Sequence, residues 1–409
     1  MFLNKFFKAL VLLFNIIWVL PVILIIKLLQ LIMNLRICGI RTDRIGHFVL
    51  DSAENKARVK KDPNQTQLFF FIGPLSNKSW AKIVKRNLNV FQILKPVYKT
   101  MQKLRIERSF IEDSSATGSR DIYGYYNKFD IKFNFNKEET NFAEKWLSGK
   151  NIPLNKKFVC FLVRDQAYLN INPIHKSNHS LWSNHNYRNS SIENYLSSME
   201  WLTERGYYVF RMGSISEKRL KTKNKNIIDY SFDENKNSLM DIWLMSKCSF
   251  CISTGSGLDS VCTVYGVPIF FLNLVPFYHI QTFSNSFYYP KSLKWKTTNE
   301  NLSLDELMYI DTKHIYKRDR IDLKIEDVNE KIIFESIKEF YHYLNESDFS
   351  FSKNQKLFWG KVTNHKTYKN FHGWKHPKSN MSDLWLNSQP KYFFSKKISK
   401  EKLAILDSI

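Results

Sequence analysis

Short apolar runs alternate with amphipathic segments between residues 151 and 275. Residues 157–163 form a continuous apolar run behind a lysine, which is typical of a strand buried on both faces of a parallel sheet. Similar runs predict three further strands, at residues 207–210, 249–253 and 268–272. Strands of this length, separated by segments long enough for helices, indicate a layered α/β domain.

Helices are predicted between these strands. Ser190 and Glu193 have the spacing of a capping box, and apolar residues then recur every three or four positions, as on one helical face. A weaker cap at Ser238 precedes a second helix, and a third over 258–265 ends at Gly266. Short connections of this kind specify right-handed crossovers, so we predict a doubly wound parallel sheet of the α/β class.

The remainder of the chain divides around this region. Residues 68–73 are predicted to form another buried strand and residues 137–147 a polar helix, and the stretch at 149–153 contains the Gly and Pro of a break. We expect four parts: a membrane anchor (1–36), a first domain (37–150), a second domain (151–330), and basic helices and a tail that fold back on the first domain (331–409).

The anchor is predicted from the N-terminal hydropathy. Residues 9–26 contain no charged side chain, and eighteen residues of helix just reach across about 27–30 Å of hydrocarbon. Pro21 and Lys27 interrupt the apolar run, so both a single tilted span and a kinked helix within one leaflet fit. The arginines that follow, Arg36, Arg41 and Arg44, favour a cytoplasmic position for the rest of the chain. A buried helix of a soluble protein is the alternative interpretation.

The charge is strongly basic, +23 at pH 7, with excesses of seven in residues 1–61 and nine in residues 351–409. Such a balance suits nucleic acid or an anionic membrane surface, although coding by an AT-rich genome would also enrich lysine. No nucleic-acid-binding signature accompanies the charge. We therefore expect an anionic membrane surface as the partner and no nucleic acid.

The cysteines indicate a reducing compartment, because five in a chain of this length make no disulfide framework. Cys248 and Cys251 form a C-x-x-C, but no second pair of metal ligands lies nearby in the sequence. We interpret both as core residues.

Polar clusters directly after the predicted strands are the candidates for a site, because doubly wound sheets bind ligands beyond the carboxyl ends of their strands. These clusters contain Arg164, Asp165 and Tyr168; Arg188 and Asn189; Arg211 and Gly213; and Ser253, Thr254, Gly255, Ser256, Gly257 and Asp259.

The chemistry of these clusters favours a phosphate-bearing ligand. The small residues of 253–257 let the backbone approach a ligand, and the loop leads into a helix whose free N–H groups suit phosphate. Arginine binds a diphosphate bidentately and stays charged. The loop lacks the lysine of a Walker motif and does not match G-x-G-x-x-G, so neither an ATPase nor an NAD enzyme is indicated.

Several motifs, taken together, resemble bacterial glycosyltransferases encoded in surface-polysaccharide loci. They are RIGH at 44–47, VRDQAY at 163–168, YRNSSIENY at 187–195, TERGYYVFRMG at 203–213 and STGSG at 253–257. The resemblance covers roughly residues 40–275. More distantly, the Arg-Asp after the first strand and the Ser/Thr-rich loop after a later one are similar to fucosyltransferases.

This resemblance implies a GT-B architecture of two Rossmann-like domains with parallel sheets, preceded here by the membrane helix. The nucleotide-sugar would bind the second domain and the acceptor the first, without a metal and with no cofactor besides the donor. Arg164 and Arg211 would neutralise the leaving phosphate, Asp259 would contact ribose or base, and Tyr168 and Asn189 would line the cleft.

His47 is the candidate for the base that takes the proton of the acceptor hydroxyl, because it follows a short strand and a glycine of the first domain. An ordinary packed histidine is the alternative interpretation. Asp51 and Glu54 are alternative bases, and the sequence leaves an inverting or a retaining course open.

The sequence therefore predicts a glycosyltransferase that moves a sugar from a nucleotide donor to a lipid-linked or nascent surface glycan. Its expected place is the bacterial inner membrane, with the catalytic domains in the cytoplasm. A sugar-nucleotide epimerase of the same fold and a non-catalytic scaffold of glycan synthesis are the alternatives.

Overall fold

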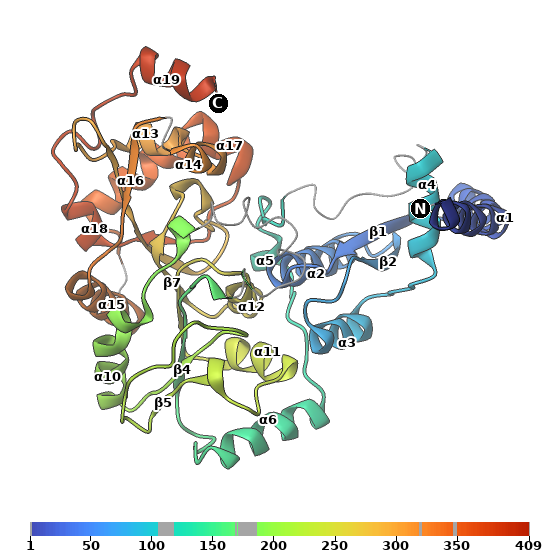
Figure 1. Ribbon diagram of the computed structural model, residues 1–409, viewed down its shortest axis with the longest axis horizontal. Helices are drawn as coiled ribbons and strands as arrows, with labels where there is room; N and C mark the ends of the chain where they lie inside the picture. Colours follow the sequence, from blue (N-terminus) through green and yellow to red (C-terminus); the bar gives the residue numbers. More distant parts are fainter. Residues whose placement is uncertain are drawn as a thin grey trace. The chain divides into compact units, whose positions relative to one another are not determined.

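The computed structural model describes residues 2–104, 118–167, 170, 186–318, 321–346 and 350–408. The chain divides into two compact units, Met1–Lys137 and Glu138–Ile409, and each is described by itself. Helix α6 (Lys137–Gly149) belongs to the second unit except for its first residue (Figure 1). The division therefore falls at the start of this helix, whereas the sequence placed a break after it.

The first unit is built on two parallel strands. β1 and β2 pair along their whole length, and a single further bridge joins Phe69 to Val90. β2 confirms the strand predicted at 68–73, and its Phe71 packs edge-on against Phe48. A larger Rossmann-like sheet was expected, but the described part of this unit pairs only these two strands. Its elements are α1 (Phe2–Ile32), β1 (Leu35–Arg41), α2 (Ile45–Lys61), β2 (Thr66–Ile72), α3 (Lys78–Asn87), α4 (Leu94–Leu104) and α5 (Tyr125–Lys128).

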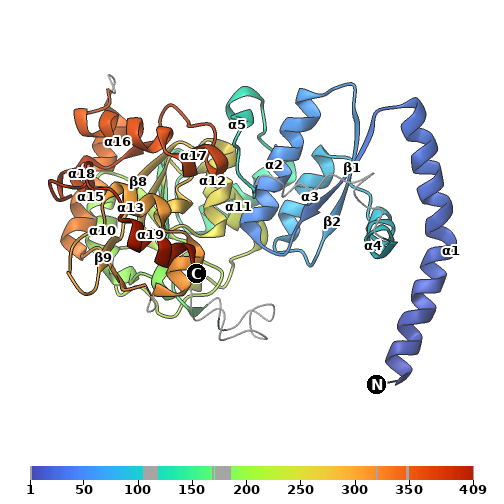
Figure 2. The same cartoon turned by 90° about the horizontal axis from the view of Figure 1, so that it is seen from above.

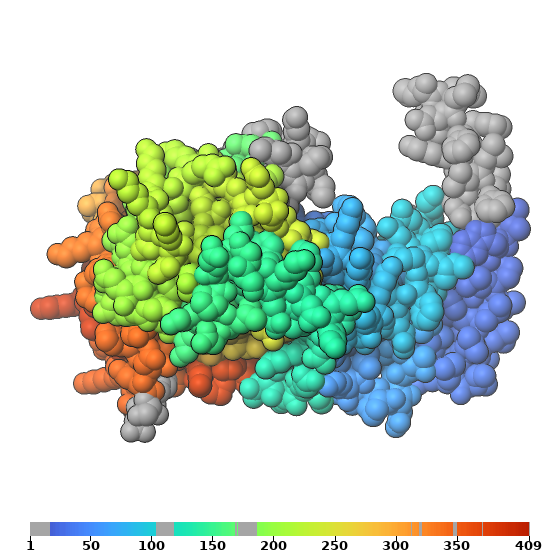
Figure 3. Space-filling view, turned by 90° about the horizontal axis from the view of Figure 1, so that it is seen from below, coloured from blue at the N-terminus to red at the C-terminus, as the bar shows by residue number. Residues whose placement is uncertain are grey.

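Helix α1 has one packed side and one open side. Val19, Ile23 and Ile26 are buried in a core shared with β1, β2 and α4. The other side exposes apolar residues at the surface (blue in Figure 3): Ile17, Leu20, Leu24, Ile25, Leu28, Leu31 and Ile32. Among the residues described, no helix is both long and apolar enough to cross a membrane. The membrane helix expected in residues 1–36 is therefore not supported, and the side chains of its buried face pack against protein.

The second unit contains a seven-stranded sheet in the order β11-β8-β7-β6-β3-β4-β5, with every neighbouring pair parallel. Its strands are β3 (Phe158–Leu162), β4 (Tyr208–Arg211), β5 (Ile227–Ile228), β6 (Cys251–Ser253), β7 (Ile269–Leu274), β8 (Ser286–Pro290) and β11 (Asn380–Met381). The first six strands follow the Rossmann order 3-2-1-4-5-6. The structure confirms the doubly wound parallel sheet and the four strands predicted between residues 157 and 272.

Helices cover both faces of this sheet (Figure 2). α10 (Leu196–Glu204) and α15 (Glu330–Asn345) lie on one face, and α11 (Ser238–Lys247) and α12 (Ser260–Tyr265) lie on the other. On the first face, Phe340 of α15 packs against Phe250 and Phe270, with ring centroids 5.6 and 5.2 Å away. The C-x-x-C cysteines are free and buried beneath these layers, as expected for core residues.

Two predicted helix caps are wrong. Ser190 does not cap a helix: its hydroxyl contacts the Tyr195 hydroxyl and accepts from Asn273, and the chain then forms a short 3-10 turn before α10. The cap of α11 is Asn237, one residue before Ser238, because its side chain accepts from two backbone amides.

The C-terminal residues belong to the second unit. β11 extends its sheet, and β9 pairs antiparallel with β10 beside it. Aromatic residues hold the helices together; Phe277, for example, packs against Phe358 and Trp385. The remaining elements are β9 (Ser292–Trp295), α13 (Leu304–Tyr309), α14 (Thr312–Tyr316), β10 (Leu323–Glu326), α16 (Lys353–Asn364), α17 (Lys366–Phe371), α18 (Asp383–Asn387) and α19 (Lys400–Asp407).

Candidate functional site

The carboxyl ends of β3 and β6 meet at the point where the strand order of the sheet reverses. Such a switch point opens a crevice at the sheet edge, since the connections leave it in opposite directions. The chain segments there are bonded to each other: the Arg164 amide donates to the Thr254 hydroxyl at 3.0 Å, and the Ser190 amide donates to the Arg164 carbonyl at 3.0 Å. Three of the four predicted clusters therefore converge.

Two guanidinium groups at this point lie close enough for the charge of one to act on the other. Arg188 donates to the carbonyl of Gly255, and burial together with the neighbouring Arg188 charge lowers the pKa of Arg164 to about 9. Both side chains are half-buried. Among the residues described, neither forms an ion pair with a carboxylate. The carboxylates of Asp165 and Asp259 act on Arg164 and Arg188 from beyond ion-pair distance. The two cations still repel each other, and an anion between them would relieve that repulsion.

The loop at 253–257 positions the Arg164–Arg188 pair, a role that the sequence did not indicate. Its amides are bonded already: Thr254 donates to the Leu162 carbonyl, Gly255 to the Ser253 hydroxyl, and Ser256 to the Asp259 carboxylate. Three of the amides expected to hold phosphate, those of Thr254, Gly255 and Ser256, thus already have acceptors within the protein. The loop instead positions Arg188 and the Arg164 backbone.

Asp259 lies under the loop. It is 1% exposed and also accepts from the Ser253 hydroxyl at 2.7 Å. Burial raises its pKa to about 6, while the hydrogen bonds from Ser253 and Ser256 act in the opposite direction. Gly257 begins a 3-10 turn there, so the helix proper starts only at Ser260. Asp259 therefore holds the loop together in this structure, and its contact with ribose or base stays a prediction.

A cavity of about 590 Å³ adjoins the arginine pair, because residues next to both arginines line it. This volume lies within the range of about 300–1,000 Å³ typical of ligand sites. Basic side chains are prominent in its wall: Arg211, Lys218, Lys291, Lys296, Arg318 and Lys324. Asp165, Glu193, Glu217 and Asp327 also line it, so cations exceed carboxylates.

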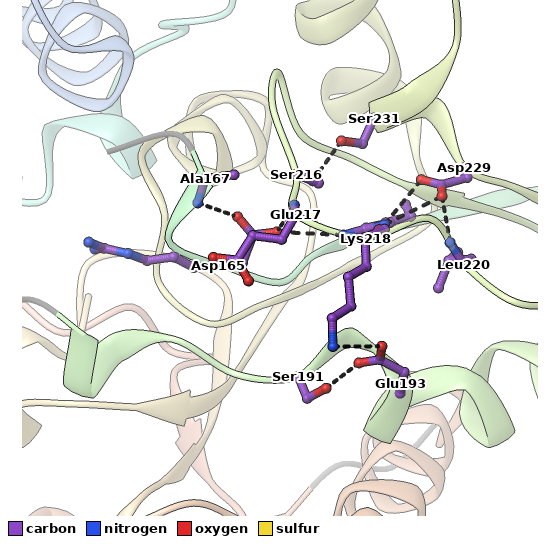
Figure 4. A network of polar contacts seen from close by, with 12 residues as sticks. Asp165, Ala167, Ser191, Glu193, Ser216, Glu217, Lys218, Leu220, Asp229 and Ser231 are labelled. Atoms are coloured by element: carbon purple, nitrogen blue, oxygen red, sulfur yellow. Dashed lines mark hydrogen bonds and ion pairs between the residues drawn. The ribbon is translucent and has the colours of Figure 1, made fainter. Parts of the chain in front are cut away.

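Arg211 pairs with two carboxylates, Asp165 and Asp229, whose polar contacts are shown in Figure 4. It is 1% exposed, and its guanidinium nitrogens lie 3.6 Å from an Asp165 oxygen and 3.4 Å from an Asp229 oxygen. These carboxylates also accept from backbone amides: Glu217 donates to Asp165, and Leu220 donates to Asp229. The network fixes the loop after β4 on the cavity wall. Its two partners neutralise Arg211, in contrast to the Arg164–Arg188 pair.

Lys291 is a site residue that the sequence analysis missed. It follows β8, is 3% exposed, and its ammonium group donates to the Asn189 carbonyl at 2.8 Å and pairs with Asp327. The Asn189 side chain donates to Gln166 at 3.0 Å. Lys291 therefore ties the segment that carries Arg188 to the sheet edge. The sequence signal that could have identified Lys291 is its position directly after the end of a strand.

The sequence also predicted Gly213 and Tyr168 as site residues. Gly213 lies after β4, where a Cβ atom would come within 3.1 Å of the Ser216 hydroxyl and 3.2 Å of the Ser231 hydroxyl. Tyr168 lies outside the described residues.

The predicted bases lie in the first unit. His47 is in the first turn of α2, and Asp51 is one turn further along the same helix and fully buried. Ser119, which the sequence did not indicate, lies between them. Glu54, the other candidate base, bonds to Arg58 at 2.6 Å.

Comparisons with known proteins add little. No family model and no curated protein matches the chain. The glycosyl transferase family 9 structure from Veillonella parvula covers 75% of this chain and 96% of its own, with 10% identity and a TM-score of 0.48. E. coli ADP-heptose LPS heptosyltransferase II covers 57% of this chain and 83% of its own, with 10% identity and a TM-score of 0.34. Likenesses this weak assign neither family nor activity.

Proposed function

We propose that this protein is a glycosyltransferase that takes its sugar from a nucleotide-sugar donor. The observation that carries the proposal is the Arg164–Arg188 pair at the switch point of a Rossmann-ordered sheet, with no carboxylate at ion-pair distance among the described residues. A diphosphate between these guanidinium groups would accept bidentate hydrogen bonds. As the sugar leaves, charge develops on the diphosphate, and fixed cations stabilise it without a metal ion.

The adjoining cavity would hold the nucleoside or the sugar. Its volume of about 590 Å³ and its polar wall suit a ligand of that size and polarity. The glycan acceptor would bind the first unit, where His47 is the proposed base. We place the acceptor among lipid-linked or nascent surface polysaccharides, on the resemblance of the motifs.

The open face of α1 supports a second part of the proposal, attachment to an anionic membrane surface. Apolar residues such as Leu24 (60% exposed) and Leu28 (54% exposed) would enter the interfacial region of one leaflet. The neighbouring helix α4 carries exposed Lys99 and Lys103, whose charge suits anionic headgroups. The protein would then work at the cytoplasmic face of the bacterial inner membrane.

Donor binding is tested by thermal denaturation of the full chain with UDP-, GDP-, dTDP- and CMP-linked sugars. We expect one nucleotide class to raise the melting temperature of the wild type, and Arg164→Ala to abolish that rise. Arg205→Ala is the matched control, because Arg205 lies on the surface over Trp201 and away from the cavity. A folded wild type that no donor stabilises would refute the donor site. Donor binding without transfer to any glycan would favour the epimerase or the scaffold.

Membrane attachment is tested by flotation with vesicles of neutral or anionic lipid. Leu24→Asp together with Leu28→Asp should abolish binding to anionic vesicles, while Leu357→Asp, at an exposed leucine of α16, should leave it intact. Equal binding of all three proteins would refute the role of α1, and a dimer that the double variant dissociates would assign this face to a second copy of the chain.

A further inference from the structure

Three polar side chains of the first unit form a hydrogen-bonded chain. Nδ1 of His47 lies 2.7 Å from the hydroxyl oxygen of Ser119, and that hydroxyl donates to Oδ1 of Asp51. Asp51 is fully buried, and Nε of Arg41 lies 3.7 Å from its other oxygen. Arg41 thus pairs with Asp51 as a carboxylate, and a carboxylate only accepts hydrogen bonds.

The positions of the protons in this series of hydrogen bonds, from His47 through Ser119 to Asp51, determine the tautomer of His47. A serine hydroxyl has one proton, and Ser119 gives it to Asp51. The Ser119 oxygen then has only lone pairs for His47, so Nδ1 of His47 must carry a hydrogen. In a neutral imidazole the other nitrogen, Nε2, is left with a lone pair. His47 makes no other hydrogen bond among the residues described.

We infer that Ser119 and Asp51 are positioning residues that hold His47 as the Nδ1–H tautomer, so that Nε2 is the atom that accepts a proton from a hydroxyl of the acceptor. This inference rests on the proposed function. The acceptor oxygen bonds to the anomeric carbon of the donor sugar, and the bond from that carbon to the diphosphate breaks, with its electron pair leaving on the diphosphate. The hydroxyl proton moves to Nε2, and Asp51 stabilises the resulting imidazolium through Ser119.

The surroundings of His47 keep the imidazole neutral before the reaction. Burial, together with the positive charges of Arg41 and Arg44, lowers its pKa to about 4, against an opposing effect of Asp43. Nε2 is therefore unprotonated at neutral pH.

The backbone at Ser119 is held in an unusual conformation. Its φ is +61° and follows a Gly118 with φ of +65°, while its side chain is buried against α2. Serine has a higher conformational free energy than glycine in the left-handed region, so the local backbone alone would favour glycine here. The hydroxyl between His47 and Asp51 is what a glycine would lack.

The test combines nitrogen NMR of the full chain labelled at histidine with steady-state kinetics. Ser119→Gly removes the hydroxyl and relaxes the backbone, so it should fold. The matched control is Ser52→Ala, which removes a buried hydroxyl of α2 that bonds to Phe48 instead. We expect His47 to be protonated at Nδ1 in the wild type and in the control. In Ser119→Gly we expect the Nε2–H tautomer to increase and kcat to fall at least tenfold, with KM for the donor unchanged.

An Nε2–H tautomer in the wild type would overturn the inference, as would a Ser119→Gly variant with wild-type kcat. A wild type without transferase activity would instead refute the proposed function, and the NMR spectrum would still decide the tautomer.

Discussion

Replacing Lys291 with methionine tests whether one buried ammonium group holds the wall of the candidate site. Methionine keeps most of the length and apolar contact of the lysine but has no donor. The side chain of Lys291 is 1% exposed, and its ammonium group donates to the Asn189 carbonyl at 2.8 Å. Burial also lowers the pKa of Lys291, against the opposing effect of Asp327.

The expected cost follows from what the substitution leaves behind. The Asn189 carbonyl loses its donor, and an unsatisfied buried acceptor costs about 1–3 kcal/mol. Asp327 is 54% exposed, so water replaces its lost partner with little further cost. At about 2–4 °C per kcal/mol for a unit of this size, we expect the melting temperature of Lys291→Met to fall by about 2–12 °C.

The matched control is Lys294→Met in the neighbouring strand β9. Lys294 pairs with Glu326 at 2.7 Å, but both side chains reach solvent, at 23% and 32% exposed. A pair of this kind contributes about 0–1 kcal/mol, so the control should melt within about 4 °C of the wild type. Thermal denaturation followed by circular dichroism measures both. Equal melting temperatures for the two variants would refute the role assigned to Lys291.

Two further predictions concern the arginine pair and the base. Gly255→Ala should destabilise the second unit by about 1–2 kcal/mol and weaken nucleotide binding, because φ of Gly255 is +79° and the new Cβ would lie 3.0 Å from Leu274. The control Gly360→Ala lies in open space on a helix and should not destabilise the unit. Chemical denaturation that shows the same loss of unfolding free energy in both variants would contradict this. Arg41→Gln should raise the pKa of His47 above about 4, since Arg41 favours the neutral imidazole; an NMR titration with an unchanged or lower midpoint would contradict this.

The sheet of the second unit was predictable where its strands are continuous apolar runs. β3, at Phe158–Leu162, is buried along its whole length, and such a run needs cover on both faces. β11 gave no such signal. It has only two residues, Asn380–Met381, and joins β8 from a distant part of the sequence, so its pairing depends on the packing of the C-terminal helices.

The positions of the site residues were predictable, but their roles were not. Arg164 and Arg188 could be found because they flank predicted strands and helices. Arg211 has the same sequence signal, yet Asp165 and Asp229 neutralise it in the folded chain. The partner that a charged side chain finds depends on tertiary contacts, which a strand pattern does not contain.

Ser119, in the first unit, is another residue whose role depends on tertiary contacts that the sequence pattern does not show. It lies far from His47 in sequence, and no motif marks it, because its relevance comes only from the hydrogen bonds it makes with two residues of α2. A single serine in a polar segment carries no pattern from which this position could be derived.

The central claim is that Arg164 and Arg188 bind the diphosphate of the donor, and calorimetric titration tests it most directly. The affinity of the wild type for a nucleoside diphosphate should exceed that for the matching nucleoside by about 10- to 100-fold, as expected for charge-assisted hydrogen bonds of about 1.5–3 kcal/mol. In the double variant Arg164→Ala, Arg188→Ala, the two ligands should bind equally. A double variant that keeps the wild-type preference for the diphosphate would contradict the account.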